Sequence, residues 1–139
     1  MAIPDSDSVS PDDAELIFRG QRAAGKAQVV GYLMFPDGRW WRACTGSTTL
    51  QPLPTGLYLC DNFRVRGEAA MVVGGVGYSV DVTPLFPTTR TLLRIHPDGN
   101  RPGTRGCIGI VDGDQTGCRN ALEFLIRSKG GVMLHVDYI

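Results

Sequence analysis

The sequence has 139 residues, which fits one domain on the usual scale of about 100–200 residues per domain. Hydrophobic residues make up 42% and charged residues 20%, a globular composition that argues against a disordered chain. The 14 basic and 14 acidic residues cancel, so the chain lacks the net positive field that attracts nucleic acid or anionic lipid.

The first segment of the chain is acidic. Residues 1–15 hold five carboxylates and no Lys or Arg, so the remainder carries a net charge of +5. We expect residues 1–14 to form a flexible acidic leader and residues 15–139 to form a single domain. The leader fits a solvated terminus, a cover for the basic body or a recruitment tag for a carrier.

The same end of the chain has no basic start followed by an apolar run, so we expect no secretory signal peptide. No stretch approaches the roughly 18 apolar residues of a membrane helix. The sequence therefore predicts a protein that is made in the cytoplasm without a signal peptide and has no membrane span.

Turn residues divide the remaining chain into short apolar runs. The 18 Gly and 9 Pro favour a mainly β (α+β) fold with many short strands. Pro36-Asp37-Gly38 lies between two such runs and predicts a hairpin, because Pro presets φ and Gly accepts a positive φ. The predicted strands, in chain order, cover residues 16–18, 29–35, 39–44, 57–60, 63–66, 92–96 and 132–136. Within residues 72–80 the glycines predict a tight turn between two strands.

One helix is predicted, late in the chain. Residues 117–128 place Leu122, Leu125 and Ile126 on one face. Thr116 is the predicted N-cap, and a pair of glycines at 130 and 131 ends the helix before the last strand.

One His and one Cys, eleven positions apart, mark the two ends of a glycine-rich loop after a predicted strand: His96 and Cys107. Gly106 lets the backbone turn before the Cys, and Arg101 and Arg105 favour thiolate over thiol. A thiolate beside a His is an arrangement for nucleophilic catalysis, with the backbone N–H groups of Gly106 and Cys107 as an oxyanion hole. Spacing alone leaves open that the His and the Cys have no shared chemical role, because a buried Cys usually acts as a small hydrophobic residue.

These residues also carry a resemblance to a known family. His96-Pro-Asp-Gly99 and Thr104-Arg-Gly-Cys-Ile108 resemble the active-site signature of the L,D-transpeptidase (YkuD-like) catalytic domain, a His, a downstream Gly, then Ser/Thr-x-Gly-Cys-Ile/Val. Upstream, Cys44-Thr-Gly-Ser47 and Leu53-Pro-Thr-Gly-Leu-Tyr58 are similar to a strand end and a Pro-x-Gly-x-Tyr turn of that family. The resemblance spans residues 16–111, and Thr-x-Gly-Cys-Ile is its most specific part.

The resemblance implies a compact β-sandwich or barrel-like domain and an activity on peptidoglycan stem peptides. Family members form an acyl-enzyme through Cys and pass the acyl group to an amine (transpeptidase) or to water (L,D-carboxypeptidase or endopeptidase). By this resemblance Cys107 is the nucleophile, His96 its base, Gly106 and Cys107 the oxyanion donors, and Thr104 a buttress of the loop. It implies no metal and no cofactor.

The chain departs from the family's pattern in two ways. The family often has Arg directly after Cys-Ile/Val, where this chain has Gly109. Arg94, Arg101 and Arg105 are therefore the candidates for contact with a substrate carboxylate, and Gly99 is assigned to substrate binding with them. The His–Cys interval is also short, as in compact members among type VI secretion effectors and phage-encoded lytic proteins.

Those compact members reach the periplasm through secretion machinery or after lysis. The resemblance thus implies action in the bacterial periplasm or cell wall, with a secretion carrier or an immunity protein as candidate partners. Transfer and hydrolysis both stay open. The alternative outside enzymes is a non-catalytic cell-wall-binding or phage structural module with the same fold.

The other cysteines and the tryptophans indicate less. Cys44, Cys60 and Cys118 show no C-x-x-C spacing, so a zinc site is not expected, and the sequence leaves a Cys44–Cys60 disulfide open. Trp40 and Trp41 are adjacent and must point to opposite faces of a strand. We expect one of them in the core, while the other is a candidate for a substrate groove.

Overall fold

A computed structural model describes residues 13–22, 24–25, 27–47, 51–98 and 104–139, and for residues 104–106 it describes the backbone. The predicted leader, residues 1–14, lies almost entirely outside this part. The strands are β1 (Leu16–Arg22), β2 (Val29–Met34), β3 (Trp40–Gly46), β4 (Gly56–Val65), β5 (Val72–Val73), β6 (Val76–Pro84), β7 (Leu93–Pro97), β8 (Thr104–Ile110) and β9 (Val132–Tyr138). The helix α1 spans Gln115–Lys129, and a short 3₁₀ turn spans Ala69–Met71.

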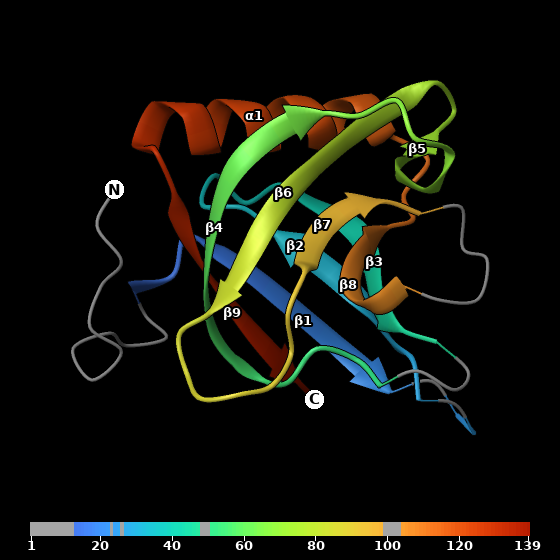
Figure 1. The fold of residues 1–139 in the computed structure, drawn as a ribbon, viewed down its shortest axis with the longest axis vertical. Coiled ribbons are helices and arrows are strands. Elements are labelled where there is room, and N and C mark those ends of the chain that lie inside the picture. Colours follow the sequence, from blue (N-terminus) through green and yellow to red (C-terminus); the bar gives the residue numbers. More distant parts are fainter. Residues whose placement is uncertain (1–12, 23, 26, 48–50, 99–103) are drawn as a thin grey trace.

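Eight of the strands form a closed barrel. The order is β4-β9-β1-β2-β3-β8-β7-β6-β5, and β4 also pairs with β6, which closes the sheet (Figure 1). Most neighbours are antiparallel, but β1 pairs with β9 and β7 pairs with β8 in parallel. This confirms the predicted mainly β fold with one late helix, and of the two architectures expected it is the barrel. None of the described helices combines the length and hydrophobicity that crossing a membrane requires.

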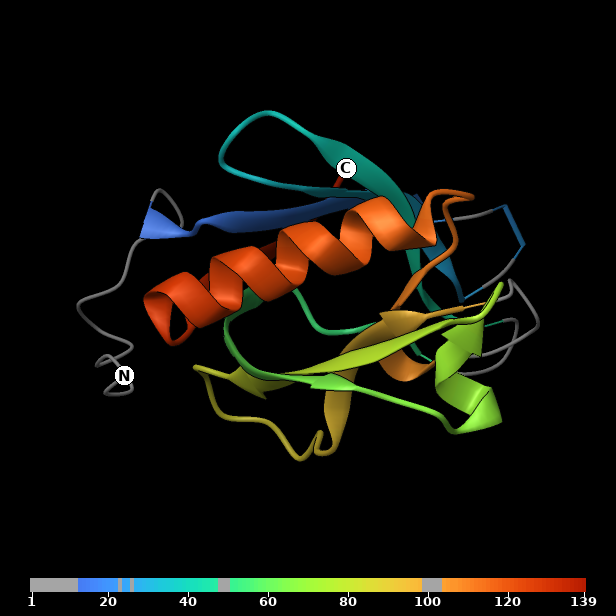
Figure 2. The ribbon, with the colours of Figure 1, turned by 90° about the horizontal axis from the view of Figure 1, so that it is seen from above.

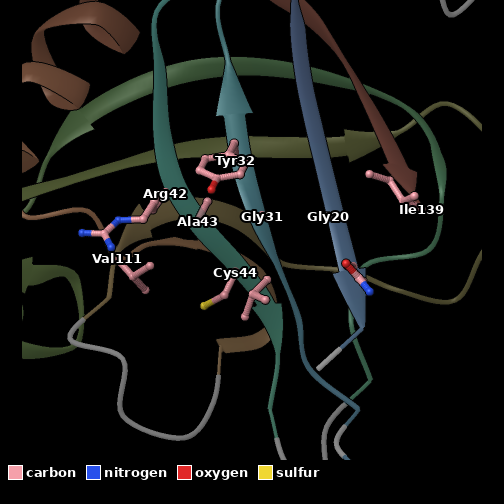
Figure 3. Close-up of a pocket in the computed structure, with 10 residues that line it drawn as sticks. Gly20, Gly31, Tyr32, Arg42, Ala43, Cys44, Val111 and Ile139 are labelled. Carbon is pink, nitrogen blue, oxygen red and sulfur yellow. The ribbon is translucent and has the colours of Figure 1, made fainter. Parts of the chain in front are cut away.

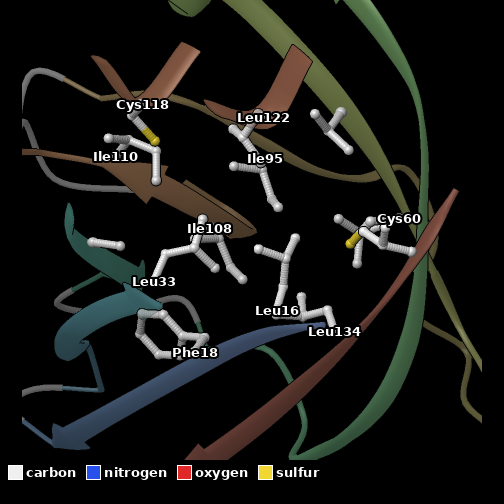
Figure 4. Packing of buried hydrophobic residues seen from close by; sticks show 14 of the residues in the cluster. Leu16, Phe18, Leu33, Cys60, Ile95, Ile108, Ile110, Cys118, Leu122 and Leu134 are labelled. Carbon is white, nitrogen blue, oxygen red and sulfur yellow. The ribbon is translucent and has the colours of Figure 1, made fainter. Parts of the chain in front are cut away.

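The barrel interior is filled by alternate residues of each strand, as the two-residue period of a strand requires. Side chains from strands all around the barrel meet in one core (Figure 4), for example Phe18 of β1, Leu33 of β2, Ile95 of β7 and Leu134 of β9. Tyr58 and Tyr78 are fully buried there. Because alternate positions face outward, the residues on either side of a core residue are available to a surface site.

The helix α1 lies along one end of the barrel, over β4, β6 and β9 (Figures 1 and 2). Its buried face includes Leu122 and Ile126, as predicted. The predicted N-cap is wrong: the helix begins two residues earlier, and Asp114 caps it by accepting from the Gly117 N–H at 3.0 Å. Trp41 Nε1 donates to the same carboxylate at 3.1 Å, so the cap also ties α1 to the barrel.

The segment 51–55 crosses the opposite end of the barrel (Figure 1). Leu53 is buried as part of the core, and its N–H donates to Thr45 Oγ1 at 3.0 Å. Tyr138 donates to the Leu53 carbonyl, and Tyr58 donates to Pro54 O at 2.5 Å. Arg90 donates to the two preceding carbonyl oxygens of this segment. A non-repetitive segment is thus fixed by side chains from three strands and a loop.

The predicted hairpin joins β2 and β3, and Gly38 has the positive φ (89°) expected of its turn. Trp41 is buried and packs edge-to-face on Phe35, with ring centroids 5.0 Å apart. Trp40 is 54% exposed and packs in the same way on Tyr32 at 4.8 Å. The two tryptophans therefore lie on opposite faces, as predicted.

Candidate active site

The parallel pair β7–β8 brings the predicted His and Cys onto one outer face of the barrel. Ile95 pairs with Ile108, both buried in the core, and His96 pairs with Gly109. His96 and Cys107 are the outward neighbours of these core residues. The pairing of β7 with β8 begins at Ile95 and Ile108, so Cys107 lies one residue before the paired part of β8.

The Cys lies inside a strand rather than at the end of a loop. The predicted loop extends through residue 106, but β8 already begins at Thr104. On the β3 side, Thr45 pairs with Ile108 and the next residue, Gly46, pairs with Thr104. Residues 105–107 therefore bulge away from β3, opposite a glycine with φ of 81°. A bulge re-aims a side chain out of the regular ladder, and here Cys107 is its last residue.

The thiol of Cys107 is half-buried, and its nearest described partner is a backbone carbonyl. Sγ donates a weak hydrogen bond to Leu92 O at 3.9 Å. Burial raises the thiol pKa above its ordinary value, while the Arg94 backbone N–H and the charges of Arg94 and Arg90 oppose that rise. At neutral pH the resting group is therefore a thiol, and a reaction at Sγ needs a base.

His96 is placed to be that base by a contact with its own backbone. Its Nδ1 lies 2.7 Å from Pro97 O. A carbonyl oxygen can only accept, so this hydrogen bond assigns the proton to Nδ1 and leaves the lone pair on Nε2. Within the described part of the chain, the imidazole and the Cys107 thiol are not hydrogen-bonded to each other.

Of the three candidate arginines, Arg94 has a described side chain. It lies in β7, two residues before His96, and its Nε lies 3.7 Å from Oδ1 of Asp81, its register partner on β6. Asp81 in turn accepts a hydrogen bond from Asn62 Nδ2 at 2.7 Å. Asn62 has a left-handed φ of 61° at the point where β4 and β6 change register. No local sequence pattern connects Asp81 and Asn62 to β7, so the sequence does not predict either of them as a site residue.

An open cavity of about 400 Å³ lies beside this face, on the outside of β1, β2 and β3 (Figure 3). Tyr32, Arg42 and Cys44 line it together with the bare backbone of Gly31. Cys44 on β3 pairs with Gly109 on β8, and Gly109 pairs with His96 on β7. A residue without a side chain therefore lies between His96 and Cys44, which lines the cavity. Burial, reinforced by the nearby Asp98 carboxylate, raises the pKa of Cys44 to about 12, which makes it a poor nucleophile.

Several predicted site residues lie outside the described part. Gly99 and Arg101 lie outside the described residues. Thr104, Arg105 and Gly106 belong to β8, where the structure describes their backbone and not their side chains. All four cysteines are free thiols. Among the described residues, no three His, Cys, Asp or Glu side chains form a group that could hold a metal ion.

Comparisons with protein-family models, with curated proteins and with solved structures found no match to this chain. Function is therefore inferred from the geometry of the β7–β8 face and from the sequence motif that lies across it.

Proposed function

We propose that this protein is a cysteine-dependent enzyme of the L,D-transpeptidase type that acts on peptidoglycan stem peptides. The observation that carries the proposal is the position of Cys107 and His96 on one outer face of two adjacent parallel strands. A nucleophile and a base on neighbouring rigid elements meet the geometric requirement for covalent catalysis.

The first half of the reaction forms an acyl-enzyme. Nε2 of His96 takes the proton of the Cys107 thiol as Sγ attacks the carbonyl carbon at the L-centre of the stem. The tetrahedral oxyanion is stabilised by the backbone N–H groups of Gly106 and Cys107, which belong to the segment that bulges away from β3. The C–N bond then breaks, His96 returns its proton to the leaving amine, and a thioester remains.

The second half releases the acyl group. Water or an amine gives its proton to His96 and attacks the thioester, and the restored thiolate takes that proton back. Water gives hydrolysis, and an amine gives transfer or D-amino-acid exchange. The raised pKa of Cys107 supports a mechanism in which the proton moves during the attack rather than beforehand.

The test compares the wild type with Cys107→Ala on purified muropeptides, with products analysed by mass spectrometry. We expect the wild type to release a terminal D-Ala, or to exchange it when a D-amino acid is added, and Cys107→Ala to do neither. Cys44→Ala is the matched control, because this nearby thiol is buried and free and its loss should spare activity. Muropeptides that the wild type and Cys107→Ala leave equally unchanged would refute the proposal.

A non-catalytic cell-wall-binding module is the second candidate. The observation that favours it is that the imidazole and the thiol are each hydrogen-bonded to a backbone carbonyl instead of to each other. Equal retention of the wild type and Cys107→Ala on purified cell wall, without turnover, is the result this alternative predicts. Under either function we propose that the protein acts in the bacterial periplasm or cell wall, delivered by secretion machinery or lysis.

A further inference from the structure

We propose that the outer face of β1, β2 and β3 binds a neutral saccharide, in the cavity that Tyr32 lines and over the exposed ring of Trp40. The side chains that carry this inference lie outside β7 and β8, so it goes beyond the proposed function and does not depend on it. Its basis is the chemistry of the face, where two aromatic rings are bordered by paired charges.

The two aromatic rings form a corner on this face. Tyr32 on β2 is 46% exposed and Trp40 on β3 is 54% exposed, although aromatic residues of this size usually bury most of their surface. Their ring centroids lie 4.8 Å apart and their planes are 79° from each other. Within the described part of the chain, neither the Tyr32 hydroxyl nor the Trp40 indole N–H is hydrogen-bonded. The apolar rings and their polar tips are therefore both available to a ligand.

The cavity extends this corner toward β1. Figure 3 shows Tyr32 between Arg42 on β3 and Ile139 beyond β1. Val30 adds a second aliphatic residue to the lining, and Gln21 adds an amide that both donates and accepts hydrogen bonds. The volume of about 400 Å³ lies within the range of about 300–1,000 Å³ that is typical of small-ligand sites. Apolar walls with a few polar groups are also the usual composition of such sites.

The charges on either side of Tyr32 are paired. Its register partners are Arg19 on β1 and Arg42 on β3. Arg19 Nε lies 3.5 Å from Asp137 Oδ2. Arg42 Nε lies 3.8 Å from Asp112 Oδ2. These four charged side chains carry no net charge, whereas nucleic acids and anionic lipids are bound by an excess of cations. The face therefore fits a neutral ligand.

A saccharide matches this combination better than other neutral ligands do. A sugar ring has C–H groups on its faces, which pack on aromatic rings, and hydroxyl groups at its edges. Because a hydroxyl both donates and accepts, it can bridge a guanidinium and the carboxylate beside it. A proline-rich peptide also packs on aromatic rings, but Pro has no N–H. Such a peptide would cover the carboxylates of Asp112 and Asp137 without offering them a donor, which costs free energy.

The aromatic surface is longer than the cavity. Trp40 pairs with Met34, two residues beyond the pair of Tyr32 with Arg42, which is about 6.6 Å along the strands. A ligand with one ring in the cavity therefore needs a further ring to reach Trp40. We expect a tetrasaccharide to bind at least about 10-fold more tightly than its monosaccharide, because it gains the contact with an aromatic anchor.

The experiment measures the binding of cellotetraose, chitotetraose and maltotetraose, all neutral, by calorimetric titration at millimolar concentration. We expect at least one of them to bind the wild type, and Trp40→Ala to weaken that binding by about 10-fold or more. Phe124→Ala is the matched control, because Phe124 is an aromatic residue of α1 that is 75% exposed. Its loss should leave the affinity unchanged.

Fluorescence locates the bound saccharide without truncating the aromatic corner. Trp40 is exposed and Trp41 is buried, so a saccharide over Trp40 should shift the emission of the wild type to shorter wavelength. Trp40→Phe keeps an aromatic ring at this position. It should therefore bind the saccharide in calorimetric titrations and lose the shift in emission.

Three results would overturn the inference. They are a failure of all three tetrasaccharides to bind, equal affinity of the wild type and a folded Trp40→Ala, and binding of a decaproline peptide through Trp40 in place of the saccharides. The muropeptide assay reports on Cys107 and the saccharide titration reports on Trp40. Either proposal can therefore fail while the other stands.

Discussion

Removing the hydroxyl of Thr45, at the end of the barrel that residues 51–55 cross, tests how this segment is held. Thr45 is fully buried, and its Oγ1 accepts the Leu53 N–H at 3.0 Å. Thr45→Val replaces the hydroxyl by a methyl group of similar size, so little cavity forms, but the buried N–H loses its acceptor. Leaving such a donor unsatisfied costs about 1–3 kcal/mol. With an unfolding entropy of about 2.1 cal/mol/K per residue, this lowers Tm by about 3–10 °C for a chain of this length.

Differential scanning calorimetry measures the loss, and amide hydrogen exchange at Leu53 locates it. Thr45→Ser is the control, because it keeps the acceptor and gives up one methyl group, worth about 1 kcal/mol. We expect the Leu53 amide to exchange faster in Thr45→Val and at the wild-type rate in Thr45→Ser. The reasoning fails if Thr45→Val melts within 1 °C, or about 0.3 kcal/mol, of the wild type, or if the two variants protect the amide equally.

Three other predictions follow from the backbone and the thiol. Leu92 is 82% exposed and has a left-handed φ of 55°, a conformation that Asn tolerates and β-branched residues do not. In guanidinium titrations Leu92→Asn should therefore raise the free energy of unfolding by about 0.5–1 kcal/mol, and Leu92→Val should lower it. A Leu92→Val variant that is more stable than the wild type would contradict backbone strain at this position. Gly31→Ala puts its Cβ 2.0 Å from Arg19 O and should lose more than about 3 kcal/mol, whereas Gly67→Ala, with nothing within 4 Å, should melt within a few degrees of the wild type. Cys107 should react with iodoacetamide before the three buried thiols. The pH at which its rate is half-maximal should lie above the ordinary thiol pKa of about 8.5, because burial raises the pKa of Cys107. A rate that has already reached its plateau at pH 7 would show instead that the resting group is a thiolate.

Local signals in the sequence predicted the elements they control. Pro36-Asp37-Gly38 predicted the β2–β3 hairpin, because a residue that accepts positive φ was present where the turn needed one. The helix was predicted from its apolar face, but its start was not. Asp114 and Thr116 both cap helices well, and the choice depends on Trp41, which is distant in sequence and bonds to the Asp114 carboxylate.

Strand continuity was harder to predict, because the same residue types (Gly, Asn and Asp) occur both in turns and at irregular positions within strands. Asp61-Asn62 separates two predicted strands in the sequence, yet both belong to β4. Asn62 takes the left-handed conformation without ending the strand, and the register of β4 against β6 shifts there instead. Gly106 in the same way predicts a loop before Cys107, but it lies in the bulge of β8.

For the candidate site, the sequence supplied the residue types but not their partners. His96 and Cys107 were found from one motif, since they lie only eleven positions apart. Their shared face depends on the parallel pairing of β7 and β8, which no local pattern encodes. Asp81 and Arg94 are related through the β6–β7 register, and Asp98 reaches Cys44 only because β3 lies on the other side of β8. Such contacts arise from the fold and cannot be derived from spacing.

The parallel pairing of the first and last strands has a consequence for the order of assembly during synthesis. β9 bridges β1 and β4, so a nascent chain that ends before Val132 exposes two unpaired strand edges and cannot close the barrel. Closing contacts over more than a hundred residues is entropically slow. The β7–β8 face that carries Cys107 therefore becomes part of a closed barrel wall only once β9 has been made.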